Sequence, residues 1–143
     1  MYRKILVALD TTAADAELLP HIAQVATLTR AELLLLHVAD GWAARNFDQL
    51  KLAESEEMKE DQLYLEDTAA RLREETGLTV RARLALGNPP SEILKIAAEE
   101  TCDLIALASH GHRLVGDIIH GSTIEEVRHK ASIPILVVPP RKP

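Results

Sequence analysis

Apolar residues along the chain gather in five short runs that are separated by more polar stretches. The runs lie at residues 5–9, 31–38 (within which 33–36 is unbroken), 80–86, 104–107 and 135–138. Unbroken apolar runs are typical of strands that are buried on both faces of a parallel sheet. The run at 80–86 is the exception, because Arg81 and Arg83 alternate with its apolar residues, and it is predicted to be an edge strand.

Four helices are predicted between these strands, because apolar residues recur there three or four positions apart. The first follows Thr12 and Asp15, which have the spacing of a capping box. It contains Pro20, which either kinks the helix or lies near its first turn. A loop is predicted at 41–49. The other helices are expected at about 50–76, around Ile93–Ala97 and at 122–130.

Strands that alternate with helices predict an α/β fold with a doubly wound parallel sheet. The chain has 143 residues, an ordinary length for one domain with its own core. Its sequence contains no internal repeat, low-complexity tract or interdomain linker. We therefore expect one domain over residues 1–143, with five strands and four flanking helices.

Composition and charge narrow the classes of function. With 16 Lys and Arg against 22 Asp and Glu, the net charge is −6, which argues against a broad basic surface for duplex nucleic acid. Aromatic residues make up 3%, too few for the stacking platform of single-strand binders. No apolar run approaches the roughly 18 residues of a membrane span, and no signal peptide is recognised. We expect a cytoplasmic protein that binds neither nucleic acid nor membrane.

The sequence has no set of metal ligands at a recognisable spacing. The single cysteine, Cys102, excludes an intramolecular disulfide and a multi-cysteine zinc site, and its place before an apolar run indicates a buried structural residue. His110, His112 and His120 share one segment, but no carboxylate or fourth ligand occurs at a recognisable spacing. No metal site is predicted.

Doubly wound sheets bind ligands at the carboxyl ends of their strands. One polar and one apolar residue at such strand ends are therefore candidates for ligand contact. Asp10 follows the first strand, where its carboxylate could accept hydrogen bonds from the hydroxyls of a ribose or cap the first helix. Val38, near the end of the second strand, could form an apolar wall for a base or belong to the core. The residues alone leave both alternatives open.

The segment after the fourth strand carries Gly111, Gly116 and Gly121, and the last of these opens a helix whose next residue is Ser122. Glycine lets backbone N–H groups approach an anion without a Cβ in the way. The helix N-terminus adds free N–H groups and a partial positive charge. The pattern predicts a phosphate site, in which Ser122 donates its hydroxyl or serves as the N-cap.

No catalytic constellation accompanies this site in the sequence. The Gly-x-Ser-x-Gly elbow of serine hydrolases, the Walker phosphate loop and a Gly-x-Gly-x-x-Gly motif after the first strand are all missing. We therefore expect a site that holds a nucleotide and has no general base to cleave it.

In its motifs and their spacing the chain resembles the universal stress protein family. The segments that carry the resemblance are 4–10, 87–94, 103–111, 121–122 and 134–138, which together span nearly the whole domain. The resemblance implies the sheet order 3-2-1-4-5, a homodimer through the last strand and, in many members, an ATP site. AMP or cyclic AMP are the alternative ligands, and Mg²⁺ would accompany ATP. The resemblance implies at most a slow hydrolysis of ATP.

Nucleotide-binding members of this family carry Gly-x2-Gly-x9-Gly-Ser/Thr. Gly111, Gly121 and Ser122 fit this spacing, whereas Ala108 takes the place of the first glycine. Asp10 matches the acid that binds the ribose. The residues that the resemblance assigns to nucleotide contact are Ala8, Asp10, Val38, Leu107, Ala108, Gly111, Gly121, Ser122 and Thr123.

Two functions are compatible with these residues. The first is a nucleotide-binding stress-response or signalling module, which Asp10, Gly111, Gly121 and Ser122 favour. The second is a nucleotide-free dimeric interaction protein with a vestigial phosphate loop, and Ala108 is the one residue that favours it.

The last strand also indicates a dimer by its own composition. All four residues of Ile135–Val138 are apolar, and an uncovered apolar edge strand is prone to aggregate. Antiparallel pairing with the same strand of a second copy would cover it, and Pro134 and Pro139 would keep the pairing short. The alternative is a monomer in which the tail, 141–143, covers this edge.

Overall fold

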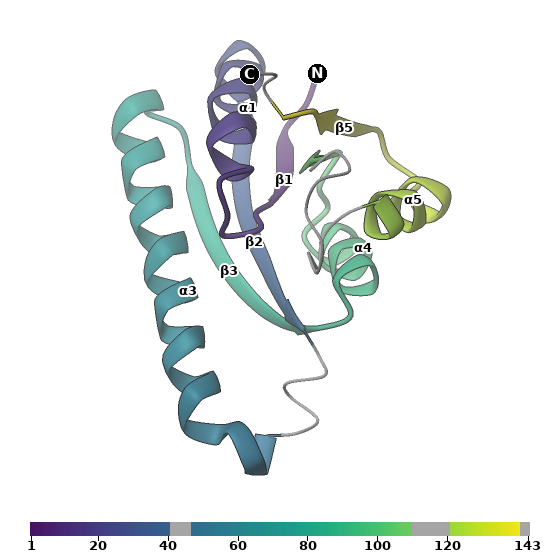
Figure 1. Cartoon of the computed structure of the whole chain (residues 1–143). Helices are drawn as coiled ribbons and strands as arrows, with labels where there is room; N and C mark the ends of the chain where they lie inside the picture. Colours follow the sequence, from purple (N-terminus) through teal and green to yellow (C-terminus); the bar gives the residue numbers. More distant parts are fainter. Residues whose placement is uncertain (41–46, 110–120, 141–143) are drawn as a thin grey trace.

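The computed structural model describes residues 1–40, 47–109 and 121–140. These residues form five strands: β1 (Lys4–Ala8), β2 (Glu32–Asp40), β3 (Val80–Gly87), β4 (Leu104–Ala108) and β5 (Ile135–Val138). The helices among them are α1 (Asp15–Thr29), α3 (Phe47–Thr76), α4 (Pro89–Glu99) and α5 (Gly121–Lys130). The predicted alternation of strands and helices is confirmed (Figure 1).

All five strands run parallel in one sheet with the order β3-β2-β1-β4-β5. The central strand β1 pairs with β2 and β4, so that Ala8 lies between Leu36 and Leu107. The strands β3 and β5 form the two edges, as the arginines of β3 and the position of β5 in the chain predict. The order implied by the family resemblance is therefore confirmed.

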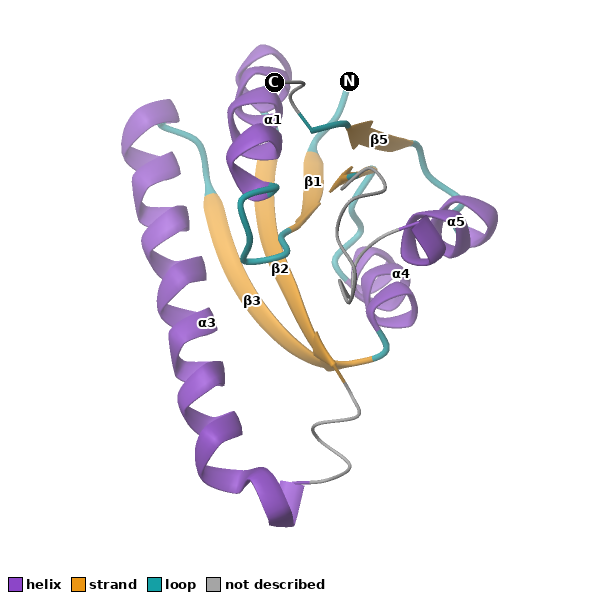
Figure 2. Ribbon diagram, in the orientation of Figure 1, coloured by secondary structure: helices purple, strands orange, loops and turns teal. Residues whose placement is uncertain are grey.

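Two layers of helices cover the sheet, with α1 and α3 on one face and α4 and α5 on the other (Figure 2). Successive strand residues alternate between the two layers: Ile5 and Val7 pack with α1 and α3, whereas Leu6 and Ala8 pack with α4 and α5. Both faces of the central strands are therefore buried, which is why residues 5–8, 33–36 and 104–108 are apolar without interruption.

The helix α3 begins earlier than its apolar pattern predicts. It starts at Phe47, so the expected loop at 41–49 is wrong for its last three positions, and the others lie outside the described residues. Among the described side chains of α3, the buried ones are Leu65, Thr68, Ala69 and Leu72, all in its second half. The amino-terminal part extends beyond the ends of β2 and β3 (Figure 2).

The start of α1 corrects the predicted capping box. The helix begins at Asp15, and its N-cap residue Ala14 makes no side-chain capping bond. The Asp15 carboxylate does not return to Thr12 but accepts hydrogen bonds from the backbone N–H groups of Asp10 and Thr11. Pro20 lies inside the helix, past its first turn.

Candidate functional site at the carboxyl ends of the strands

The direction of winding reverses between the neighbouring strands β1 and β4. From β1 the chain winds outward to β2 and β3, and it then crosses to β4 and β5 on the other side. Ligands of doubly wound sheets bind beside this reversal, at the carboxyl ends of the strands. Ala8 and Leu107 are register partners there, so the ends of β1 and β4 lie side by side.

Asp10 stands two residues beyond the end of β1 and is half-buried. Its backbone N–H donates to Asp15 Oδ1 over 2.9 Å, and its Oδ2 accepts the hydroxyl hydrogen of Thr12 over 3.1 Å. Because the N-cap of α1 is Ala14, the helix-capping alternative for Asp10 is wrong. Its carboxylate is instead held at the end of the central strand.

A histidine to which the sequence pattern assigns no role helps to shape this edge. His37 Nδ1 lies 2.9 Å from the carbonyl oxygen of Leu9, and because a carbonyl only accepts, Nδ1 carries the proton. Its Nε2 faces Asp61 Oδ2 of α3 at 3.5 Å. The imidazole thus joins the ends of β1 and β2 to α3. Its only sequence signal is its position near the end of a strand.

The predicted apolar contacts are nearly closed to solvent. Ala8 and Val38 are 4% and 3% exposed and pack in the cluster under α4 and α5, and Leu107 lies in the same cluster. Each side chain is therefore part of the core. A ligand above them would meet their backbone and at most a small part of the two smaller side chains.

Ala108, which replaces a glycine of the family motif, points its methyl group away from this cluster. It packs in the other cluster, with α1 and α3, and is 6% exposed. Alternation along β4 explains this, since Leu107 faces the opposite layer. The additional methyl group fills core space on the α1 side of the sheet.

The start of α5 supplies the other half of the predicted site. Because α5 connects the parallel strands β4 and β5, its N-terminus lies at the carboxyl edge of the sheet. Gly121 is its first residue, Ser122 is exposed and Thr123 is buried. Gly111, like the segment 110–120 that contains the three predicted loop histidines, lies outside the described residues.

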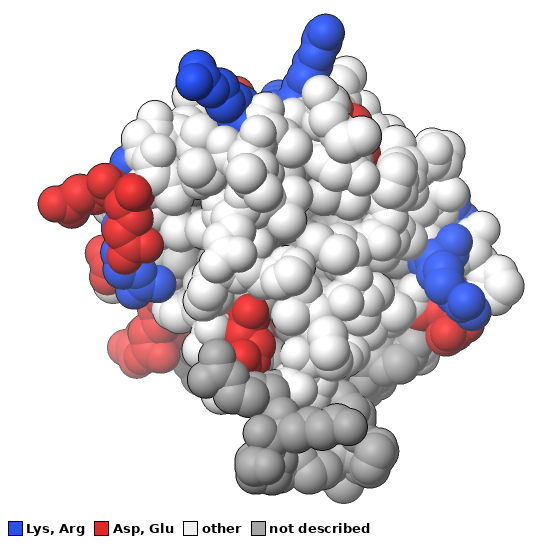
Figure 3. Space-filling model, turned by 90° about the horizontal axis from the view of Figure 1, so that it is seen from above, with Lys and Arg blue, Asp and Glu red and all other residues white. Residues whose placement is uncertain are grey.

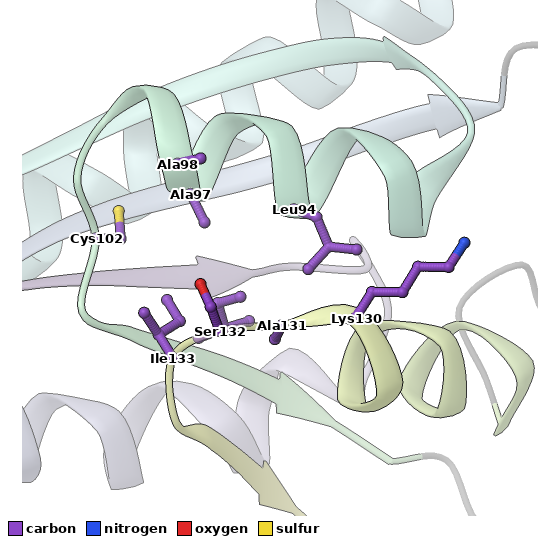
Figure 4. A pocket seen from close by; sticks show the side chains of 9 residues that line it. Leu94, Ala97, Ala98, Cys102, Lys130, Ala131, Ser132 and Ile133 are labelled. Carbon is purple, nitrogen blue, oxygen red and sulfur yellow. The ribbon is translucent and has the colours of Figure 1, made fainter.

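A separate cavity of about 210 Å³ lies between α4 and the end of α5 (Figure 4). Cys102 lines it and precedes β4, so this cavity is at the amino end of that strand, remote from the carboxyl edge. Burial raises the pKa of the Cys102 thiol to about 11, so the thiol stays protonated near neutral pH. The structural interpretation of this cysteine is confirmed.

Charges on the described surface are mixed in sign. On the face in Figure 3, Lys and Arg side chains stand near Asp and Glu around the rim, and the described residues there form no continuous basic patch. At the amino ends of the strands Glu100 accepts from Arg81 over 2.7 Å and lies near Lys4 and Arg83. The hydrogen bond from Arg81 lowers the pKa of Glu100.

The described residues include neither a membrane-spanning helix nor a cluster of metal ligands. None of their helices is long and apolar enough to cross a membrane. Within the same residues, no three His, Cys, Asp or Glu side chains are grouped so that they could hold a metal ion.

Known proteins share both this sequence pattern and this fold. The chain belongs to the universal stress protein family, whose model matches residues 1–139. It is 32% identical over 154 residues to Universal stress protein MJ0577 of Methanocaldococcus jannaschii, covering 96% of this chain and 95% of that protein. The solved structure of MJ0577 has a TM-score of 0.86 and 31% identity, with 100% of this chain and 99% of that chain covered.

Two other solved structures have the same fold at lower identity. The universal stress protein of Archaeoglobus fulgidus in complex with dAMP has a TM-score of 0.71 and 23% identity, with 96% of this chain and 98% of that chain covered. A universal stress protein in complex with cAMP has a TM-score of 0.70 and 17% identity, with 96% of each chain covered. The resemblance predicted from the sequence is therefore confirmed at the level of family and fold.

Proposed function

We propose that this protein binds an adenine nucleotide at the carboxyl edge of its sheet and acts as a stress-response or signalling module. The observation that carries the proposal is the convergence of three features beside the β1–β4 reversal. These are the Asp10 carboxylate after β1, the small residue Ala8 opposite β4, and the N-terminus of α5 with Gly121 and Ser122.

Each feature suits one part of a nucleotide. The Asp10 carboxylate can accept hydrogen bonds from the two hydroxyls of a ribose, and charged acceptors form strong hydrogen bonds. The first N–H groups of α5 and the Ser122 hydroxyl can donate to phosphate oxygens, which the helix dipole also favours. The backbone beside Ala8 and Val38 would border the base.

The position of Ala108 supports this proposal over the nucleotide-free alternative. Ala108 is the residue that favours a vestigial phosphate loop, yet its methyl group is buried with α1 and α3. A methyl group on that side takes no space above Ala8 and Leu107, which belong to the opposite layer. The departure from the glycine pattern is therefore compatible with a bound nucleotide.

We propose ATP as the ligand in the cell, with AMP and cyclic AMP as alternatives, and the cytoplasm as the site of action. The dAMP and cAMP complexes of proteins with this fold support an adenine ligand. Mg²⁺ would enter with ATP on its phosphates, as is usual for this ion. The described carboxylates form no metal cluster of their own that would hold it.

Mass spectrometry of small molecules released from the purified protein tests this proposal. Protein denatured after gel filtration should release an adenine nucleotide, and the Asp10→Ala variant, purified in parallel, should release much less. Release of a molecule without adenine, in equal amounts from both proteins, would contradict the assignment of this site.

We further propose a homodimer joined through β5. This strand is a sheet edge, pairs on one side with β4, and carries Val137 with 39% of its surface exposed. Antiparallel addition of the same strand from a second copy would satisfy its outer backbone groups about a two-fold axis. Pro134 and Pro139 confine that pairing to the four residues between them.

Light scattering of the wild type and of Val137→Lys tests the dimer. The wild type should have the mass of two chains at tens of micromolar, and the variant the mass of one, because a lysine at the two-fold contact faces its own copy. Leu63→Lys is the control, since Leu63 is exposed on α3 and away from β5. A wild-type monomer, or a dimer in Val137→Lys, would contradict the proposal.

A further inference from the structure

A buried carboxylate lies beneath the loop that carries Asp10. Asp15, the first residue of α1, is 1% exposed. Its Oδ1 accepts the backbone N–H of Asp10 over 2.9 Å. Its Oδ2 accepts the backbone N–H of Thr11 over 2.9 Å and the hydroxyl hydrogen of Tyr64 over 2.8 Å. Three donors from the loop and from α3 therefore converge on one side chain.

The direction of these bonds distinguishes Asp15 from a helix cap. A capping side chain accepts from N–H groups in the first turn of its own helix. The two amides bound by Asp15 precede α1 and belong to the connection from β1. The carboxylate therefore fixes the loop, and Tyr64 fixes the carboxylate from α3.

The loop requires such a restraint because Thr11 has a strained backbone. Its φ is +59°, in the left-handed region that β-branched residues rarely adopt. Strain of this kind persists where the surrounding structure imposes it, and it is concentrated at functional sites. The bond from the Thr11 N–H to Asp15 Oδ2 holds this conformation directly after Asp10.

Burying the charged Asp15 carboxylate lowers the stability of the folded protein. Burial raises the pKa of Asp15, and within the described part of the chain Asp15 forms no ion pair. The titratable groups that face it are His37 from β2 and Tyr64 from α3, and Arg71 acts on Tyr64 in turn. A buried carboxylate with hydrogen bonds but no cation is unfavourable for stability alone.

We propose that Asp15, locked by Tyr64, is a positioning residue of the nucleotide site, which fixes the backbone of Asp10 and so aims its carboxylate at the ligand. This inference rests on the proposed function. It also makes the affinity for nucleotide depend on the docking of α3, because the hydroxyl of Tyr64 reaches Asp15 across 49 positions of sequence.

The variant Asp15→Asn tests the proposal. An amide of the same shape keeps one acceptor oxygen but turns an NH₂ group toward the remaining donors, so one backbone bond is lost. Hydrogen exchange of the Asp10 and Thr11 amides should accelerate about tenfold, and the Kd for ATP should rise about three- to tenfold. The midpoint of urea unfolding should stay level or rise, because the buried charge is removed.

Three further variants complete the experiment. Tyr64→Phe should raise the Kd in the same direction by a smaller factor, and it carries the test if Asp15→Asn does not fold. Asp67→Asn, at an exposed position of α3, and Tyr2→Phe, before β1, are the matched controls and should behave as the wild type. A merely structural role would lower stability and leave the Kd of the folded variants unchanged.

A pH series separates the role of this carboxylate from other titrations. The ratio of the Kd of Asp15→Asn to that of the wild type should fall toward one as the pH falls through the pKa of Asp15. The wild-type carboxylate then gains a proton and can accept fewer hydrogen bonds. It then resembles the amide of Asp15→Asn, which already has one acceptor fewer. The nucleotide itself titrates alike in both experiments, so its own effect cancels in the ratio.

The outcomes distinguish this inference from the proposed function. Unchanged amide exchange in Asp15→Asn, or faster exchange with an unchanged Kd, overturns the positioning role while nucleotide binding stands. If the wild type binds no adenine nucleotide, the proposed function fails and the positioning role fails with it, and amide exchange still decides whether Asp15 holds the loop.

Discussion

The substitution Ala108→Gly restores the family's glycine and probes how the site tolerates alanine. The Ala108 methyl group is 6% exposed in the core with α1 and α3. Its removal forfeits about 0.8 kcal/mol of hydrophobic burial, and a glycine inside a strand costs about 0.5–1 kcal/mol more. We therefore expect the free energy of unfolding to fall by about 1–2 kcal/mol, with nucleotide affinity unchanged or increased.

Urea unfolding and titration calorimetry of the same preparations measure the two effects. The control is Ala106→Gly, because Ala106 lies two residues earlier on the same strand, faces the same layer and is fully buried. It should lose a similar free energy of unfolding, and its affinity for nucleotide should equal that of the wild type. The reasoning is refuted if Ala108→Gly is as stable as the wild type, or if it binds ATP tenfold more weakly.

Three further substitutions test other parts of the account. Asp10→Ala should weaken ATP binding by about 1–3 kcal/mol, measured by calorimetry, because it removes hydrogen bonds to a charged acceptor. Gly121→Val should abolish the phosphate contact, so that ATP binds no more tightly than adenosine to a variant with a wild-type circular dichroism spectrum. Glu100→Gln should lower the free energy of unfolding at pH 7 by about 1 kcal/mol. Since the bond from Arg81 lowers the pKa of Glu100, this difference should vanish as the pH falls through that pKa.

Much of the fold could be predicted because burial on both faces leaves a direct mark on the sequence. The runs at 5–9 and 33–36 are apolar at every position, and both include buried residues of the central strands β1 and β2. The start of α3 could not be found in this way. Its first residues extend beyond the ends of β2 and β3, and the buried positions that mark the helix in the sequence come later, from Leu65 on.

The candidate site was predictable where it depends on strand ends and not where it depends on tertiary contacts. Asp10 and Val38 follow from the rule that ligands bind at carboxyl ends. The role of Asp15 does not, because Thr12 and Asp15 have the spacing of a local cap while the actual partners of Asp15 include Tyr64, 49 positions away. The spacing of nearby residues can indicate the start of a helix, but it cannot reveal a partner as distant in sequence as Tyr64.

The side of the sheet that Ala108 faces could be predicted only in part from the sequence. Alternation along β4 assigns Ala108 and Ala106 to the same layer once the strand is known to start at Leu104. What the sequence lacks is the identity of the helices on that side, which depends on the order of the strands. The contact of Gly111 with a nucleotide stays a prediction, because Gly111 lies outside the described residues.

The central claim is that this chain binds an adenine nucleotide, and isothermal titration of the wild type measures it most directly. Titration with ATP and Mg²⁺, AMP and cyclic AMP should give saturable heat with at least one ligand, with one nucleotide per chain. The same ligand should raise the melting temperature, since binding to the folded state alone stabilises it. No heat and no thermal shift with any of the three, up to millimolar concentration, would contradict the account.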